Sequence, residues 1–251
     1  MDILPLSPPT ADARLPYGSD PLQFGDLRLP QAKGRHPVAI VIHGGFWRAA
    51  YGLDHIGHLC AALTAAGLAT WNVEYRRIGN DGGGWPGTFE DVLRGAGHVA
   101  TLAEKYPVDA KRTIAVGHSA GGHLALLLAG RQRVRGVVSL AGVADLRRAW
   151  ELGLSNNAVA SFLGGSPQEV PGRYRQASPL ELLPLGVPQR LVHGAKDDVV
   201  PFEISENYVK AAKTAGDDAR LVALPQAGHF ELIDPRFAEW PHIQQTALAL
   251  L

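Results

Sequence analysis

Short apolar runs alternate with amphipathic segments along most of this chain, and no other feature constrains its fold as strongly. The runs are typical of strands buried on both faces, and they fall at residues 38–42, 68–75, 113–116, 134–140, 190–192 and 219–224. Helical spacing of apolar residues follows at residues 54–67, 88–96, 120–129, 204–215 and 235–251. This alternation predicts an α/β fold, with a mostly parallel central sheet flanked by helices and right-handed crossovers.

Local signals predict where some elements begin. We expect Asp54 to be a helix N-cap, and we expect Thr88 with Asp91 to form a variant of the capping box. Residues 1–21 contain five prolines and predict an irregular arm. Residues 22–29 predict a short strand or hairpin arm.

A single domain covering residues 1–251 is the expected organisation, because the chain shows neither an internal repeat nor a second hydrophobic core. Residues 143–186 interrupt the alternation with short helical patterns and many glycines and prolines. We interpret this segment as an insertion that forms a short helical lid over the carboxyl edge of the sheet.

Composition excludes several classes of protein. Lys and Arg together number 24, as do Asp and Glu, so no basic surface for nucleic acid or an anionic membrane is expected. A single Cys excludes an internal disulfide framework and a cysteine-based metal site. Residues 1–5 lack the basic and apolar regions of a signal peptide, and no apolar run is long enough for a membrane span. We therefore expect a cytoplasmic protein, and we allow for a homodimer.

The strongest chemical signal is the G-x-S-x-G motif at residues 117–121. It follows a predicted buried strand and opens an apolar helix, which is the setting of a nucleophilic serine on a sharp turn. The tight turn requires small neighbours, which Gly117, Gly121 and Gly122 supply. We predict Ser119 as the nucleophile, the alternative being an ordinary turn in which Ser119 only caps the helix.

An acid and a histidine follow later strands. His229 comes after the last predicted strand and is the expected general base. Asp197 and Asp198 compete to orient it, and we assign Asp197, leaving Asp198 as a loop or capping acid. The order Ser119, Asp197, His229 is that of one hydrolase class. The alternative for His229 is a structural histidine in a loop. The alternative for either Asp is a helix N-cap, since Pro201 suits a first helical position.

A glycine turn at residues 43–47 follows the first central strand. Its backbone N–H groups, together with that of Ala120, can stabilise a developing oxyanion. The alternative is a turn that only connects strand and helix. We expect Gly44, Trp47, Trp85 and His118 to border the substrate pocket.

Other candidates carry less weight. The glycine-rich segment 79–87 lacks the Lys-Ser/Thr of a phosphate loop and is interpreted as a loop at the edge of the site. Asp54, His55 and His58 have helical spacing but no third-ligand motif, so no metal site is predicted.

Three motifs together resemble the α/β-hydrolase superfamily, within its esterase/lipase branch. The segments 17–20, 27–30, 43–48 and 74–76 are also similar to kynurenine formamidases and their bacterial esterase relatives. The resemblance implies Ser119 as nucleophile, His229 as base and Asp197 as its orienting acid. By motif position it implies N–H donors at Gly45, Phe46 and Ala120. Lipase-like members often have a glycine where Phe46 stands, so we expect a narrower acyl pocket.

The resulting hypothesis is a cofactor-independent serine hydrolase that cleaves small acyl or aryl esters through an acyl-enzyme. One alternative is an arylformamidase that hydrolyses a formyl amide of the N-formylkynurenine type. Two others are a peptidase of the prolyl-oligopeptidase type and a non-catalytic protein of the same fold. In each enzymatic case the partner is a small-molecule ester or amide substrate.

Overall fold

The computed structural model describes residues 3–251. Met1 and Asp2, which belong to the stretch where no signal peptide is predicted, lie outside the described residues. Within that range the chain forms an eight-stranded sheet in the order β1-β2-β4-β3-β5-β6-β7-β8. The strands are β1 (Ala13–Pro16), β2 (Phe24–Arg28), β3 (His36–Ile42), β4 (Ala69–Val73), β5 (Val108–His118), β6 (Val137–Leu140), β7 (Gln189–Gly194) and β8 (Ala219–Leu224). Pairing is antiparallel for β1 and β2 and parallel from β4 to β8, as predicted for the six later strands.

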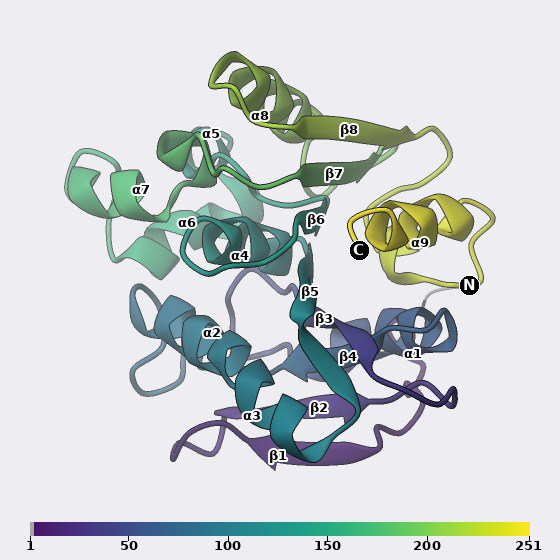
Figure 1. The fold of residues 1–251 in the computed structure, drawn as a ribbon. Coiled ribbons are helices and arrows are strands. Elements are labelled where there is room, and N and C mark those ends of the chain that lie inside the picture. Colours follow the sequence, from purple (N-terminus) through teal and green to yellow (C-terminus); the bar gives the residue numbers. More distant parts are fainter. Residues whose placement is uncertain (1–2) are drawn as a thin grey trace.

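Helices cover both faces of the sheet (Figure 1). The α-helices are α1 (Gly57–Ala65), α2 (Gly87–Gly97), α3 (Val99–Lys105), α4 (Ala120–Ala129), α5 (Leu146–Glu151), α6 (Leu154–Leu163), α7 (Pro171–Ala177), α8 (Glu203–Thr214) and α9 (Trp240–Leu248). Short 3-10 turns are η1 (Leu53–Ile56), η2 (Pro179–Leu182) and η3 (Phe230–Ile233). Helices α1 and α9 pack on one face, and α2, α4 and α8 pack on the other.

The side-chain alternation of β3 joins two hydrophobic cores. Val38, Ile40 and Ile42 contribute to the core beneath α2, α4 and α8. Ala39 and Val41 point the other way, into the core beneath α1 and α9. Both sides of a central strand are therefore buried, which explains why the strand reads as a continuous apolar run.

The long connection between β6 and β7 carries α5, α6, α7 and η2. Inside α6, residues 155–157 have left-handed backbone angles, with φ of 48°, 54° and 53°. Non-glycine residues adopt this conformation at a cost, so the surrounding contacts must hold the segment in place. One of those contacts is the hydrogen bond that the Arg48 side chain donates to the Ser155 carbonyl.

Three local predictions were wrong. Residues 13–16, expected within an irregular arm, form β1 at the edge of the sheet. Asp54 caps no helix, because it lies inside η1 and α1 begins only at Gly57. Thr88 and Asp91 form no capping box at the start of α2. Their side chains instead connect the helix to Arg76. The Thr88 hydroxyl donates to the Arg76 carbonyl, and the Asp91 carboxylate accepts from the Arg76 guanidinium.

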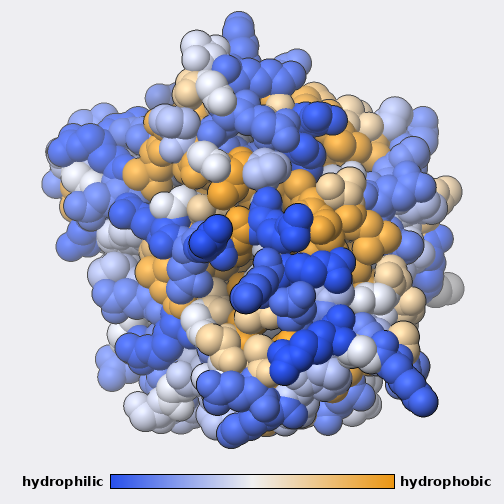
Figure 2. All heavy atoms as spheres, in the orientation of Figure 1, coloured by the Kyte–Doolittle hydropathy of each residue, from blue (hydrophilic) through white to orange (hydrophobic). Residues whose placement is uncertain are grey.

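Polar and charged residues cover much of the face seen in Figure 2, and hydrophobic residues show between them nearer the middle. Acidic and basic residues are equal in number, 24 of each. Among residues 3–251 there is no helix whose length and apolar composition would let it cross a membrane.

Candidate active site

Ser119 occupies a strained turn between β5 and α4. Its φ and ψ are 56° and −121°, which a non-glycine residue adopts only under constraint. The turn is held by a hydrogen bond from the Ser119 N–H to the Leu140 carbonyl, at 2.8 Å. A Cβ on Gly117 would lie 2.1 Å from the Gly121 carbonyl oxygen, and a Cβ on Gly121 would lie 2.0 Å from that of Ile42. The spacing of the motif thus follows from close backbone approach, which only glycine permits.

Asp197 and His229 form a hydrogen-bonded pair after β7 and β8. His229 Nδ1 lies 2.7 Å from Asp197 Oδ2, and both side chains are buried. The N–H groups of Val199 and Val200 donate to Asp197 Oδ1, and His193 Nε2 lies 3.2 Å from Oδ2. Burial would raise the pKa of Asp197, but the hydrogen bonds from His193 and His229 outweigh it and hold that pKa well below its ordinary value.

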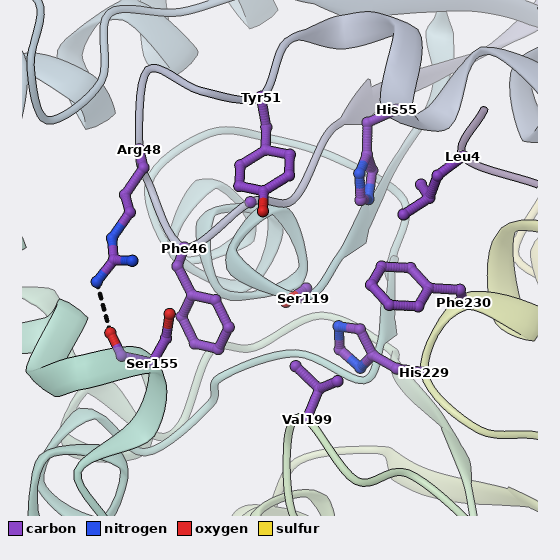
Figure 3. A pocket seen from close by; sticks show the side chains of 11 residues that line it. Leu4, Phe46, Arg48, Tyr51, His55, Ser119, Ser155, Val199, His229 and Phe230 are labelled. Atoms are coloured by element: carbon purple, nitrogen blue, oxygen red, sulfur yellow. Dashed lines mark hydrogen bonds between the residues drawn. The ribbon is translucent and has the colours of Figure 1, made fainter. Parts of the chain in front are cut away.

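Ser119 and His229 line the same pocket, as Figure 3 shows. The Ser119 hydroxyl makes no hydrogen bond to another described residue, so it is free to align with His229 Nε2. The structure therefore brings together the three residues predicted to act as nucleophile, base and orienting acid.

His118, predicted at the edge of the pocket, is instead fully buried behind His229 and does not line it. Its Nε2 donates to the His229 carbonyl oxygen at 3.0 Å. Its Nδ1 then accepts from His55 Nε2, at 2.9 Å. Burial lowers the pKa of His118 well below its ordinary value, so the ring is neutral and serves to position the His229 backbone.

The glycine turn after β3 adopts three successive left-handed conformations. Gly45, Phe46 and Trp47 have φ of 105°, 47° and 56°. Within the described residues, the N–H groups of Gly45, Phe46 and Ala120 have no hydrogen-bond acceptor. A Cβ on Gly44 would lie 3.1 Å from the Ser119 Cβ, so the turn packs directly against the serine. Three unpartnered donors beside a serine are what an oxyanion hole requires.

A buried ionic cluster that no sequence motif predicted supports this turn. His43 Nε2 donates to Glu74 Oε1 at 3.0 Å, and its Nδ1 donates to the Gly44 carbonyl at 2.8 Å. Arg77 lies 2.9 Å from the same Glu74 oxygen. Burial would raise the pKa of Glu74, but His43 and Arg77 overcome this effect and lower it. The His43 that opens the glycine motif is thus a structural support for the turn.

The pocket has a volume of about 190 Å³. Its walls come from segments far apart in the chain, namely Leu4, Gly45, Phe46, Arg48, Tyr51, His55, Ser119, Ser155, Val199, His229 and Phe230. Most of these side chains point toward the space beside Ser119 in Figure 3. No group of three or more His, Cys, Asp or Glu side chains in residues 3–251 is arranged to hold a metal ion.

Three further pocket predictions were wrong. Gly44 does not line the cavity, because the serine turn covers it. Trp47 is fully buried, with its indole N–H directed to His123 and its ring stacked on Phe162. Trp85 stacks on Phe89 outside the pocket. The positions that sequence reasoning missed, Arg48, Tyr51 and Ser155 among them, follow no motif that marks a pocket wall.

Comparisons with known proteins agree on the fold. The chain has a TM-score of 0.82 and 23% identity to a truncated carbohydrate esterase from gut microbiota, covering 98% of this chain and 99% of that one. For the butyrate-bound esterase Est2 of the planctomycete Thermogutta terrifontis the TM-score is 0.77 at 21% identity, covering 97% and 94%. These likenesses show the α/β-hydrolase fold.

Sequence comparison gives two curated relatives. Esterase LipC of Mycobacterium tuberculosis (strain ATCC 25618 / H37Rv) is 28% identical over 88% of this chain and 60% of LipC. A probable isoprenylcysteine alpha-carbonyl methylesterase, ICME, of Oryza sativa subsp. japonica is 25% identical over 86% and 57%. The chain thus spans about three fifths of the length of these relatives. The BD-FAE family model matches residues 26–211, well over half of the chain, which therefore belongs to the BD-FAE family.

Proposed function

We propose that this chain is a carboxylic ester hydrolase that acts through an acyl-enzyme on Ser119. The observation that carries the proposal is the convergence on one pocket of a strained serine, a histidine paired with a buried carboxylate, and the unpartnered N–H groups of Gly45 and Phe46. The names of both curated relatives, an esterase and a methylesterase, support ester chemistry.

In the proposed acylation step, Asp197 fixes the proton of His229 on Nδ1 and leaves Nε2 with a lone pair. Nε2 takes the proton of the Ser119 hydroxyl as its oxygen attacks the ester carbonyl. The carbonyl oxygen becomes an anion, which the N–H groups of Gly45, Phe46 and Ala120 stabilise. Collapse of this intermediate expels the alcohol, which takes the proton held by His229.

Deacylation repeats the same steps with water. His229 Nε2 removes a proton from a water molecule, which attacks the acyl group on Ser119. The same N–H groups stabilise the second oxyanion, whose collapse breaks the bond between the Ser119 oxygen and the acyl carbon. The carboxylic acid is released, and the Ser119 oxygen takes the proton held by His229. Because Asp197 stays ionised, it stabilises the imidazolium in both half-reactions.

Small acyl or aryl esters fit the pocket best. Its volume of about 190 Å³ lies below the several hundred Å³ typical of sites for larger ligands. Phe46, Val199 and Phe230 give it apolar walls near the serine. Short acyl chains would bury their apolar surface there without the space that a long chain needs.

The first test concerns the nucleophile. We expect Ser119→Ala to lower ester turnover by about 10³-fold or more while the fold remains intact, because the covalent step is lost. A serine-directed organophosphate should label Ser119, as peptide mass spectrometry would show. Ser155→Ala, which removes the other serine lining the pocket, is the control and should keep the label. Label on a different residue would contradict the mechanism.

The substrate class is tested with a panel of acyl p-nitrophenyl esters assayed beside N-formylkynurenine. We expect higher kcat/KM on the short esters, and faster hydrolysis of the formyl amide would contradict the ester assignment. The resemblance to kynurenine formamidases, the single domain with its lid, the homodimer and the cytoplasmic location stay predictions.

A further inference from the structure

The walls of the pocket carry an unbalanced positive charge. Among the described residues that line it, Arg48 is the one with a permanently charged side chain, and no Asp or Glu is present. The other walls are apolar or neutral polar groups, apart from the histidines. Other arginines close to the site are paired with carboxylates, Arg76 with Asp91 and Arg77 with Glu74.

The backbone of Arg48 is fixed relative to the reaction centre. Its N–H donates to the Gly45 carbonyl at 3.0 Å, so it belongs to the same turn as the oxyanion donors. An isolated parallel bridge joins it to Ile78. A ligand group held by Arg48 would therefore sit at a defined distance from Ser119, which is the condition for selecting substrates by charge position.

The guanidinium of Arg48 uses little of its hydrogen-bonding capacity. Its Nη2 donates to the Ser155 carbonyl at 2.5 Å, at one edge of the pocket in Figure 3. A guanidinium has five N–H donors, and among residues 3–251 this one has neither a second acceptor nor a carboxylate partner. None of its nitrogens is both buried and unpartnered, so the remaining donors are accessible.

We propose that Arg48 binds a carboxylate of the substrate, so that the preferred substrates are esters that carry a free carboxylate elsewhere in the molecule. The planar fork of a guanidinium matches the two oxygens of a carboxylate, and nothing on the pocket walls competes for it except the neutral Ser155 carbonyl. The proposal rests on the proposed ester hydrolysis and names the substrate class of that site.

The experiment compares substrates that differ in one charge. 3-Acetoxybenzoate and 3-acetoxybenzamide place a carboxylate or a neutral amide of similar size on the leaving group. Phenyl hemiadipate and its terminal amide do the same on the acyl side. At pH 7 the carboxylates are ionised. We expect kcat/KM of the wild type to favour the carboxylate in at least one pair by about 10- to 100-fold, mainly through KM, as expected for a charged hydrogen bond.

Variants of Arg48 separate binding of a substrate carboxylate from structural support of residues 155–157. Arg48→Gln keeps a polar N–H donor on a shorter side chain but has no charge, so the acid-to-amide ratio should fall to about one. Arg48→Lys keeps the charge without the fork and should retain part of the ratio. Arg133→Gln, which removes an exposed arginine outside the pocket, should leave the ratio unchanged.

The inference would be overturned if neither pair showed a carboxylate preference in the wild type. It would also be overturned if Arg48→Gln lowered acids and amides equally and kept the ratio, because that is the effect of a purely structural residue. If Arg48→Gln does not fold, the ratio in Arg48→Lys decides, since an unchanged ratio there excludes bidentate binding. Wild-type enzyme that hydrolysed none of the four esters, nor phenyl acetate, would instead overturn the proposed function.

Discussion

Two adjacent carboxylates in one loop have very different surroundings. Asp197 has a fully buried carboxylate that accepts hydrogen bonds from His229 and from two backbone N–H groups. Asp198 is exposed and hydrogen-bonds to none of these groups. The chain order of the motifs predicted an acid at this place, but the choice between neighbours depends on which side chain the loop turns inward, and the structure supports Asp197.

Replacing each acid should separate their roles. We expect Asp197→Asn to lower kcat by about 10³- to 10⁴-fold, because an amide can no longer hold His229 in the tautomer that accepts a proton from Ser119. Asp198→Asn makes the same change in size and charge, and its kcat should stay within about twofold of the wild-type value. Steady-state kinetics on a short ester measures both. Equal losses in the two variants would show that our assignment of the orienting acid is mistaken.

At the scale of elements, the turn after β3 carries two of the three N–H groups proposed as oxyanion donors, and it also lines the pocket. Its positive φ values at Phe46 and Trp47 send two neighbouring aromatic rings to different places. Phe46 faces the pocket next to Ser155, and Trp47 enters the core against Phe162. We therefore expect Phe46 to limit the space that is available to an acyl chain.

The acyl-length series tests this limit. Along p-nitrophenyl esters we expect kcat/KM to favour acetyl to butyryl over decanoyl by about 10- to 100-fold, since a clash costs more than each added methylene gains. Phe46→Gly should shift the optimum to longer acyl chains. Glycine adopts a φ of 47° without strain, so the turn should keep its conformation. A wild-type optimum at ten carbons or more would contradict the small pocket.

The matched control for that series is Trp85→Phe. The sequence predicts Trp85 on the pocket wall, whereas the structure places its ring against Phe89. The variant should leave the dependence on chain length unchanged. A shifted optimum in Trp85→Phe would mean that the glycine-rich loop reaches the site after all.

Prediction from sequence succeeded where the structure depends on interactions between residues that are close in sequence. Buried parallel strands read as apolar runs, and the G-x-S-x-G spacing follows from contacts within one turn, at Gly117 and Gly121. It failed where side-chain direction depends on unusual backbone angles, as at Trp47, or on distant partners. Thr88 and Asp91 looked like a capping box because nothing in the local sequence indicates that Arg76 would bind both.

At the scale of the whole molecule, the parallel sheet explains why the site could be assembled at all. Parallel strands end at one edge, so residues after β5, β7 and β8 meet there although Asp197 and His229 are 32 positions apart in sequence and Ser119 is farther still from both. The strand alternation predicts this convergence. It does not predict the remaining walls, such as Leu4 and Ser155, which reach the pocket from the amino-terminal arm and the long connection.

The same burial that builds two cores also encloses several histidines, and this makes the fold sensitive to acid. Burial lowers the pKa of His123 to about 4 and that of His55 to about 3. In the unfolded chain both return to an ordinary value near 6.5. Between these values the unfolded state binds more protons, so the free energy of unfolding falls as the pH drops below about 6.5.

His123 allows the effect to be measured away from the reacting atoms. Its ring accepts from the Trp47 indole and donates to the Ala177 carbonyl, and the amide of a glutamine can replace both hydrogen bonds. We expect His123→Gln to reduce the pH dependence of the free energy of unfolding between pH 6.5 and 4, by up to about 1.4 kcal/mol per pH unit. Urea unfolding at a series of pH values measures this slope, and His242→Gln at an exposed position is the control for losing one histidine. If the slope stayed that of the wild type, proton uptake by His123 would contribute nothing to acid unfolding, and the loss of stability would have to come from the other buried histidines.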